Sequence, residues 1–335
     1  MATLSITART ANTIGQIKTQ ALVALVPDKK TLSPPLKALD KLLGGTVTNA
    51  IRNGDFSSSL GSHHWLPGSA GVQRVLLIGC GDIGGQTVSS AKKLAETLAR
   101  SLVSSQARDA LVWTDGLTGK VRDASMLLEQ IALQLTLAHY QYEHTLNQRK
   151  KPARPLKRVA VSPGNLCSIA QAKRSVAIGG ATGQGANLTR ELVNLPGNIC
   201  TPKYLSGQAR KLARMHSKLS VSVLNEQQMA SLGMHSLLSV GNGSDQPSQL
   251  IVMKYQGASA KTRPYCLVGK GITFDTGGIS LKPGGKMDEM KFDMCGGAAV
   301  FGTMRAVAEM KLRLNVIGIV PATENMPGGA ATKPG

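Results

Sequence analysis

The sequence predicts an α/β fold in two domains, a smaller N-terminal domain followed by a larger one with a mixed, largely parallel sheet. Its 335 residues exceed the roughly 250 to 300 at which a single hydrophobic core stops growing. Hydrophobic residues make up 42% of the chain and aromatic residues only 3%, which predicts aliphatic cores. Aliphatic runs alternate with segments of helical periodicity, the order typical of parallel strands joined by helices.

In the N-terminal half, short aliphatic runs indicate strands and leucines at helical spacing indicate helices. Residues 20–27 form a β-branched and aliphatic run that ends at a proline. Leu94, Leu98 and Leu102 fall on one face of a helix. The strands predicted in this half are 20–27, 74–78 and 109–113, and the predicted helices are 36–51, 87–101 and 125–140.

The same alternation continues in the C-terminal half and ends in a strand–helix–strand unit. A helical pattern over 172–193 is interrupted by glycines at 179, 180 and 183. Thr201 has the N-cap position of a helix that begins at Pro202. We expect domains at 1–165 and 196–335, joined by a connecting helix at 166–195. The other predicted elements are strands 219–224 and 249–255, helix 226–232, a glycine-rich loop 233–245, buried strands 265–269 and 314–320, and helix 294–311.

Charge and cysteine content restrict the class of protein. The net charge of +20 and the pI near 10.0 favour polyanionic partners, unless an acidic segment outside these residues offsets the charge. Five widely spaced cysteines, an odd number, fit a reducing compartment, and we expect the cytoplasm. Residues 1–27 lack acids and faintly resemble a transit peptide, but 21–26 fits a buried strand better. No apolar run reaches the about 18 residues of a membrane span, so we expect no membrane partner.

Three other features could suggest a functional site, but the surrounding sequence favours a structural explanation for each. Residues 79–84 match the dinucleotide pattern G-x-G-x-x-G, but no acidic strand end follows about 20 residues later, so a glycine-rich turn is favoured. The basic, proline-containing stretch 146–158 fits a solvated loop better than a phosphate-binding patch. Four histidines lack ligand partners at suitable spacing and are expected at the surface: His63, His64, His139 and His144.

The stretch 266–298 has the composition of a metal site. It places Lys270, Asp275, Lys282 and Asp293 between a strand-like run and a helix of small residues. Clustered carboxylates favour a divalent ion such as Mg²⁺, Mn²⁺ or Zn²⁺, although aspartates that only cap loops are the alternative. A lysine ligand is unusual, because the ammonium group has no lone pair until the metal displaces its proton.

Three strings in this region resemble the leucyl aminopeptidase family, the cytosol aminopeptidases and bacterial aminopeptidase A. They are V-G-K-G-I-T-F-D-T-G-G-I-S-L-K-P at 268–283, M-D-E-M-K-F-D-M-C-G-G-A-A-V at 287–300 and E-N-M-P-G-G-A-A-T-K-P-G at 324–335. Weaker matches at 190–198 and 232–241 extend the likeness over most of the chain. The resemblance implies a hexameric, two-metal exopeptidase that removes N-terminal residues, leucine preferred, from peptides.

The resemblance also implies a role for five residues. Lys270, Asp275 and Asp293 would be metal ligands, with Asp275 bridging two divalent ions, Mn²⁺ or Zn²⁺ with Mg²⁺ as a further candidate. Lys282 would be the catalytic lysine beside the scissile carbonyl, where a positive charge stabilises the developing oxyanion. Met290 would line the pocket for the N-terminal side chain of the substrate.

One family motif is absent from residues 1–335. The string N-T-D-A-E-G-R supplies two further acidic ligands and an arginine in the family, and no D-x-E precedes Gly-Arg in this sequence. We therefore expect a C-terminally truncated form with an incomplete metallopeptidase domain. We also expect an exposed sheet edge at 314–320, with a risk of aggregation.

Two alternatives to a peptidase remain at this point. Some bacterial relatives also bind DNA as architectural proteins, and the basic charge of this chain fits such a role. A non-catalytic homologue that keeps only the fold is less consistent with the retention of Lys270, Asp275, Lys282 and Asp293. The DNA alternative would depend most on a basic cluster: Arg149, Lys150, Lys151 and Arg154.

Overall fold

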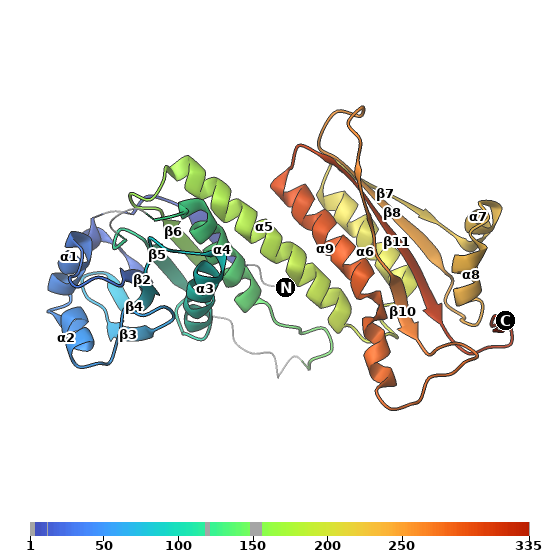
Figure 1. Cartoon of the computed structure of the whole chain (residues 1–335), viewed down its shortest axis with the longest axis horizontal. Coiled ribbons are helices and arrows are strands. Elements are labelled where there is room, and N and C mark those ends of the chain that lie inside the picture. Colours follow the sequence, from blue (N-terminus) through green and yellow to red (C-terminus); the bar gives the residue numbers. More distant parts are fainter. Residues whose placement is uncertain (1–3, 12, 118–120, 148–155, 335) are drawn as a thin grey trace. The chain divides into compact units, whose positions relative to one another are not determined.

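A computed structural model describes residues 4–11, 13–117, 121–147 and 156–334. The chain divides into two compact units, the first formed by Met1–Gln141 and Leu146–Gly183 and the second by Tyr142–Thr145 and Gln184–Gly335. Helix α5 (Ile169–Asn194) carries the chain from the first unit into the second (Figure 1). Both units are α/β, as the sequence predicts.

The first unit is built on a six-stranded sheet in the order β1-β6-β5-β2-β4-β3. All neighbouring strands are parallel except β3, which runs antiparallel to β4. The strands are β1 (Ser5–Ala8), β2 (Thr19–Pro27), β3 (His63–Pro67), β4 (Val72–Gly81), β5 (Asp109–Trp113) and β6 (Arg158–Ser162).

Helices cover both faces of this sheet, and β2 is buried on both sides as a result. Alternate residues of β2 belong to two separate cores, Val23 to one and Leu22 to the other. The core of Val23 contains α3 (Val88–Val103) and α4 (Ala124–His139), and that of Leu22 contains α1 (Pro34–Leu42) and α2 (Thr46–Arg52). A short 3₁₀ helix, η1 (Ile14–Gln16), precedes β2. Burial on both faces explains the uninterrupted aliphatic run of β2.

Two predictions for the helices of the first unit are wrong. The segment predicted as one helix over 36–51 is two helices, because Gly44 and Gly45 have φ angles of 67° and 83° and end α1 before α2 begins. The glycines predicted to interrupt 172–193 lie inside an unbroken α5 of 26 residues. Gly179 and Gly183 allow close packing instead. A Cβ on Gly179 would lie 2.1 Å from the Glu129 carbonyl oxygen.

The second unit contains a mixed sheet in the order β10-β11-β8-β7, with β9 also paired to β11. Strands β9 and β10 run parallel to β11, whereas β8 runs antiparallel to both β11 and β7. The strands are β7 (Leu219–Leu224), β8 (Gln249–Gln256), β9 (Tyr265–Val268), β10 (Gly271–Asp275) and β11 (Asn315–Asn325).

Helices α6 (Pro202–Met215) and α9 (Cys295–Met310) share one aliphatic core with this sheet. Thr201 caps α6 as predicted, and its Oγ1 accepts a hydrogen bond from the Tyr204 N–H at 3.3 Å. Helix α7 (Glu226–Ser231) is followed by α8 (His235–Gly241), so the loop predicted at 233–245 is wrong in its central part. A 3₁₀ helix, η3 (Met287–Met294), leads directly into α9.

The edges of this sheet differ from the prediction. Strand β11 has partners on both sides and is not an edge, because β9 and β10 together occupy the flank opposite β8. The predicted burial of the strand at 265–269 is also wrong. Tyr265 is 67% exposed and Val268 is 71% exposed.

All five cysteines are free thiols, with Cys80 and Cys200 buried. Burial raises the pKa of the Cys200 thiol to about 12. Within the described ranges, no helix combines the length and the apolar character that a membrane span requires.

Candidate metal centre

The candidate ligands come from three consecutive parts of the strand–helix–strand unit in the second unit. Lys270 lies in the break between β9 and β10, and Asp275 is the last residue of β10. Asp293 belongs to η3, which leads into α9. Because β10 and β11 are parallel, Asp275 lies at the carboxyl end of the sheet, where α/β proteins bind ligands.

Glycines bring the start of α9 against the backbone at Lys270. A Cβ on Gly269 would lie 2.3 Å from the Gly296 carbonyl oxygen, and the Gly297 N–H donates to the Lys270 carbonyl oxygen at 2.7 Å. Gly296 and Gly297 therefore serve close packing. Gly277 and Gly278 both have positive φ and form a tight loop after Asp275.

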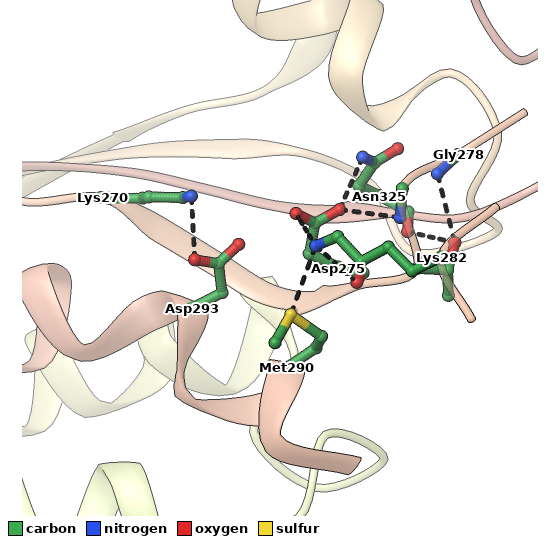
Figure 2. Close-up of polar contacts among 9 residues, drawn as sticks. Lys270, Asp275, Gly278, Lys282, Met290, Asp293 and Asn325 are labelled. Carbon is green, nitrogen blue, oxygen red and sulfur yellow. Dashed lines mark hydrogen bonds and ion pairs between the residues drawn. The ribbon is translucent and has the colours of Figure 1, made fainter. Parts of the chain in front are cut away.

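The four charged side chains form two ion pairs (Figure 2). Lys270 Nζ lies 2.8 Å from Asp293 Oδ1, and Lys282 Nζ lies 2.6 Å from Asp275 Oδ2. The lysine side chains are 56% and 36% exposed, respectively, whereas the carboxylates are mostly covered. Each carboxylate thus has an ammonium partner that solvent, or a ligand, can reach.

The Asp275 carboxylate accepts hydrogen bonds from two other groups besides Lys282. Its Oδ1 accepts hydrogen bonds from the Gly277 N–H at 3.0 Å and from Asn325 Nδ2 at 2.7 Å. Burial tends to raise the pKa of the Asp275 carboxyl, but hydrogen bonds from Lys282, Gly277 and Asn325 outweigh this effect and lower the pKa. The group is therefore an anion at neutral pH, the form that binds a cation.

Asn325 is a residue of this cluster that the sequence reasoning missed. It lies opposite Asp275 in the register of β10 and β11, and it belongs to the string at 324–335 that the resemblance singles out. The register of two parallel strands 50 residues apart cannot be deduced from spacing. The family string was the available signal.

Lys282 and Met290, for which the resemblance implies roles beside the substrate, lie next to each other. Lys282 Nζ is 3.2 Å from Met290 Sδ, and it also donates to the Asp275 carbonyl oxygen at 3.1 Å. The predicted catalytic lysine and the predicted pocket residue are therefore neighbours.

The donor set fits part of a two-cation centre. Asp275 and Asp293 supply carboxylate oxygens, and Lys270 supplies an amine that can bind after losing its proton. Among the residues that the structure describes, no group of three or more His, Cys, Asp or Glu side chains could hold a metal ion.

The histidines predicted at the surface differ in their burial. His63 is exposed on β3, and His144 is exposed, as expected. The prediction for His139 is wrong, because it is buried on α4 with its Nε2 3.1 Å from the Leu156 carbonyl oxygen. The cluster at residues 149–154 lies outside the described residues.

The G-x-G-x-x-G motif spans the end of β4 and the turn that follows it, and its first two glycines pack against the chain's own backbone. A Cβ on Gly79 would lie 2.2 Å from the Ser59 carbonyl oxygen, and the Gly81 N–H donates to the Ser58 carbonyl oxygen at 2.8 Å. Residues 57–62 therefore occupy the space that the first two glycines leave open. This geometry supports the glycine-rich turn favoured from the sequence.

Two family models match the chain. Residues 187–335 match the model described as "Cytosol aminopeptidase family, catalytic domain", and residues 22–149 match "Cytosol aminopeptidase family, N-terminal domain".

Curated relatives and solved structures agree with these matches. A probable cytosol aminopeptidase from Alkalilimnicola ehrlichii is 41% identical over 99% of this chain, and one from Thioalkalivibrio sulfidiphilus is 42% identical over 95%. The chain spans 66% and 64% of the lengths of these relatives.

Among solved structures, a mutant of tomato leucine aminopeptidase is similar over 99% of this chain and 65% of its own, with a TM-score of 0.81 and 27% identity. The bottromycin maturation enzyme BotP in complex with Mn is similar over 94% of this chain and 62% of its own. Its TM-score is 0.76 and its identity 28%.

Proposed function

Because the chain belongs to the cytosol aminopeptidase family, we propose that it is the larger part of a metal-dependent aminopeptidase that releases N-terminal residues, leucine preferred, from peptides. The observation that supports this most is the pair of lysine–aspartate contacts at the carboxyl end of the second sheet. Lys282 and Asp275 are 2.6 Å apart, and Lys270 and Asp293 are 2.8 Å apart.

We propose that Lys270, Asp275 and Asp293 hold divalent cations, Mn²⁺ or Zn²⁺, with Mg²⁺ as a further candidate. The similarity to BotP, whose solved structure is a complex with Mn, supports this choice. Bound cations would supply Lewis-acid polarisation of the substrate carbonyl and an activated water. Asp275 would serve as the central ligand, because its carboxylate already accepts three hydrogen bonds from side chains and backbone in a fixed orientation.

The chain's own residues would position the substrate and stabilise charge. The side chain of Lys282 is 36% exposed, so its ammonium group can donate to the carbonyl oxygen on which negative charge develops. Met290 lies against the same Nζ. The substrate side chain next to the scissile carbonyl would therefore contact Met290, in agreement with the pocket role that the resemblance implies.

Activity of residues 1–335 on their own is a separate part of the proposal. These residues contain no N-T-D-A-E-G-R string, and among the described residues no three His, Cys, Asp or Glu side chains form a group that could hold a metal ion. We therefore expect the 335-residue chain alone to bind a first cation weakly and to leave leucyl substrates intact.

The experiment compares the chain with a chimera that adds the stretch of the Alkalilimnicola ehrlichii relative that the chain does not match. With Mn²⁺ or Zn²⁺, the chimera should hydrolyse leucine p-nitroanilide, whereas the chain alone should not. Lys282→Ala in the chimera should lower kcat by about a hundredfold or more, and the exposed control Lys254→Ala should not. A folded, metal-loaded chimera without activity would contradict the function, and hydrolysis by the chain alone would contradict only its inactivity.

For assembly and location, we infer a homohexamer for a chain as long as the relatives, and the cytoplasm. The family resemblance supports the first inference. The names of the relatives and the five free thiols support the second. An architectural DNA-binding role is the alternative function, supported by the net charge of +20.

A further inference from the structure

A cavity of about 380 Å³ opens in the first unit beside the end of β2. Its walls are the loop that follows β2, helix α1 and helix α2. Aliphatic side chains, among them Val26, Leu36 and Ile51, form part of its lining. This volume falls within the range of pockets that bind small molecules.

The walls of the cavity are fixed by hydrogen bonds within the protein. Ser33 Oγ donates to the Gly116 carbonyl oxygen at 2.9 Å, which anchors the loop at the start of α1. The Asp40 carboxylate accepts from the Val47 and Thr48 N–H groups at 2.9 and 3.1 Å, which ties the first turn of α2 to α1. A preformed site of this kind does not have to be ordered by its ligand.

The charge around the cavity is strongly positive. Four cationic residues line it, and none of the described residues that line it is acidic. Lys30, Lys37 and Arg52 form no ion pair with any residue that the structure describes. Two carboxylates lie beside the lining, Asp40, which is held by α2, and Asp28, which accepts a hydrogen bond from Ser58 Oγ at 2.8 Å, so cations outnumber acids around the cavity. The four cations are Lys29, Lys30, Lys37 and Arg52.

The position of the cavity is one where open α/β sheets bind ligands. The chain leaves β2 for α1 on one face of the sheet, and it leaves the neighbouring β4 for α3 on the other face. The carboxyl end of β2 therefore lies at a switch in the direction of the connections, where a crevice forms.

We propose that this cavity binds a small organic phosphate, with the phosphate held by Lys30, Lys37 and Arg52 and an aliphatic portion against Ile51, which is 40% exposed. Among the described residues that line it there is no aromatic side chain on which a nucleobase could stack. The proposal goes beyond peptide hydrolysis, because all the residues that carry it belong to the first unit.

The test titrates the 335-residue chain by calorimetry with n-butyl phosphate, inorganic phosphate, n-butanol and a short DNA duplex. Butyl phosphate should bind about tenfold or more tightly than phosphate, because the butyl group is buried. The double variant Lys37→Ala/Arg52→Ala should weaken butyl phosphate binding about tenfold or more. The control Lys18→Ala/Lys41→Ala removes the same charge from exposed residues outside the cavity and should change it little.

Ile51→Ala tests the contribution of the butyl group to binding separately from that of the phosphate. It should weaken the binding of butyl phosphate and leave that of phosphate unchanged, which a general charge effect would not do. Circular dichroism checks that each variant is folded. Three results would each overturn the proposal. The two double variants could weaken binding equally, butyl phosphate and phosphate could bind with equal affinity, or only the duplex could bind in a way that depends on Lys37 and Arg52.

Discussion

At the scale of single residues, two adjacent glycines of α5 have opposite surroundings. A Cβ on Gly179 would lie 2.1 Å from the Glu129 carbonyl oxygen and 3.0 Å from Ala132 Cβ, whereas a Cβ on Gly180 would meet nothing within 4 Å. Backbone of α4 cannot move aside as a flexible side chain can. The first glycine is therefore required by packing and the second is not.

Alanine at these two positions should change stability in opposite directions. Gly180→Ala should raise the free energy of unfolding by up to about 1 kcal/mol through helix propensity. Gly179→Ala should lower it by about 1 to 3 kcal/mol because the added methyl group overpacks the contact with α4. Thermal or urea unfolding of both variants measures the difference, and the same sign for both would show that α5 does not pack on α4 at this distance.

Some residues of the candidate metal centre could be identified from the sequence, and one could not. Asp275 and Asp293 were identifiable as carboxylates in a glycine-rich stretch, but only the family strings singled out Lys270 as a ligand. Asn325 was missed because its contact with Asp275 depends on the pairing of β10 with β11. Spacing along the chain does not specify which strands become neighbours.

At the scale of elements, β9 is a short edge strand with apolar side chains in solvent. Tyr265 and Val268 are 67% and 71% exposed, and β9 has β11 as its only strand partner within the described part of the chain. The opposite edge of the same sheet, β7, exposes serines instead, at 220 and 222. An apolar open edge favours pairing with another chain.

A charge on β9 should therefore reduce self-association of the 335-residue chain. Val268→Lys should lower the concentration-dependent rise in light scattering, because a lysine on an edge strand opposes pairing with a second chain. Ser220→Lys adds the same charge to β7 and should have little effect. If both variants lower scattering equally, net charge rather than the β9 edge is responsible.

The elements that the sequence predicted best are the ones with the longest periodic patterns. Strand β2 and helices α3, α4 and α9 were identifiable because their aliphatic residues recur over many positions. Strands β1, β3 and β6 are only four or five residues long. They were missed, whereas the equally short β5 was predicted, because β5 has four apolar residues in a row and the other three strands have at most three.

At the scale of the whole molecule, the net charge of +20 predicts binding to duplex DNA at low salt. The logarithm of the affinity should fall linearly with the logarithm of the salt concentration, by about 0.9 for each phosphate neutralised. Replacing Arg149, Lys150, Lys151 and Arg154 by glutamine should make this slope shallower if they form the contact. A filter-binding or fluorescence-anisotropy titration measures it, and the absence of a complex at low salt would exclude the DNA alternative.

The central position of β11 has a consequence for synthesis on the ribosome. This strand lies between β8 on one side and β9 with β10 on the other, yet it is the last of the five to be translated. Strands β8, β9 and β10 therefore leave the exit tunnel before β11 does. Their edges that pair with β11 stay unpaired until residue 325 has emerged. The second sheet must close late, as long-range pairings do, so a nascent chain stalled before β11 would be a natural client for chaperones.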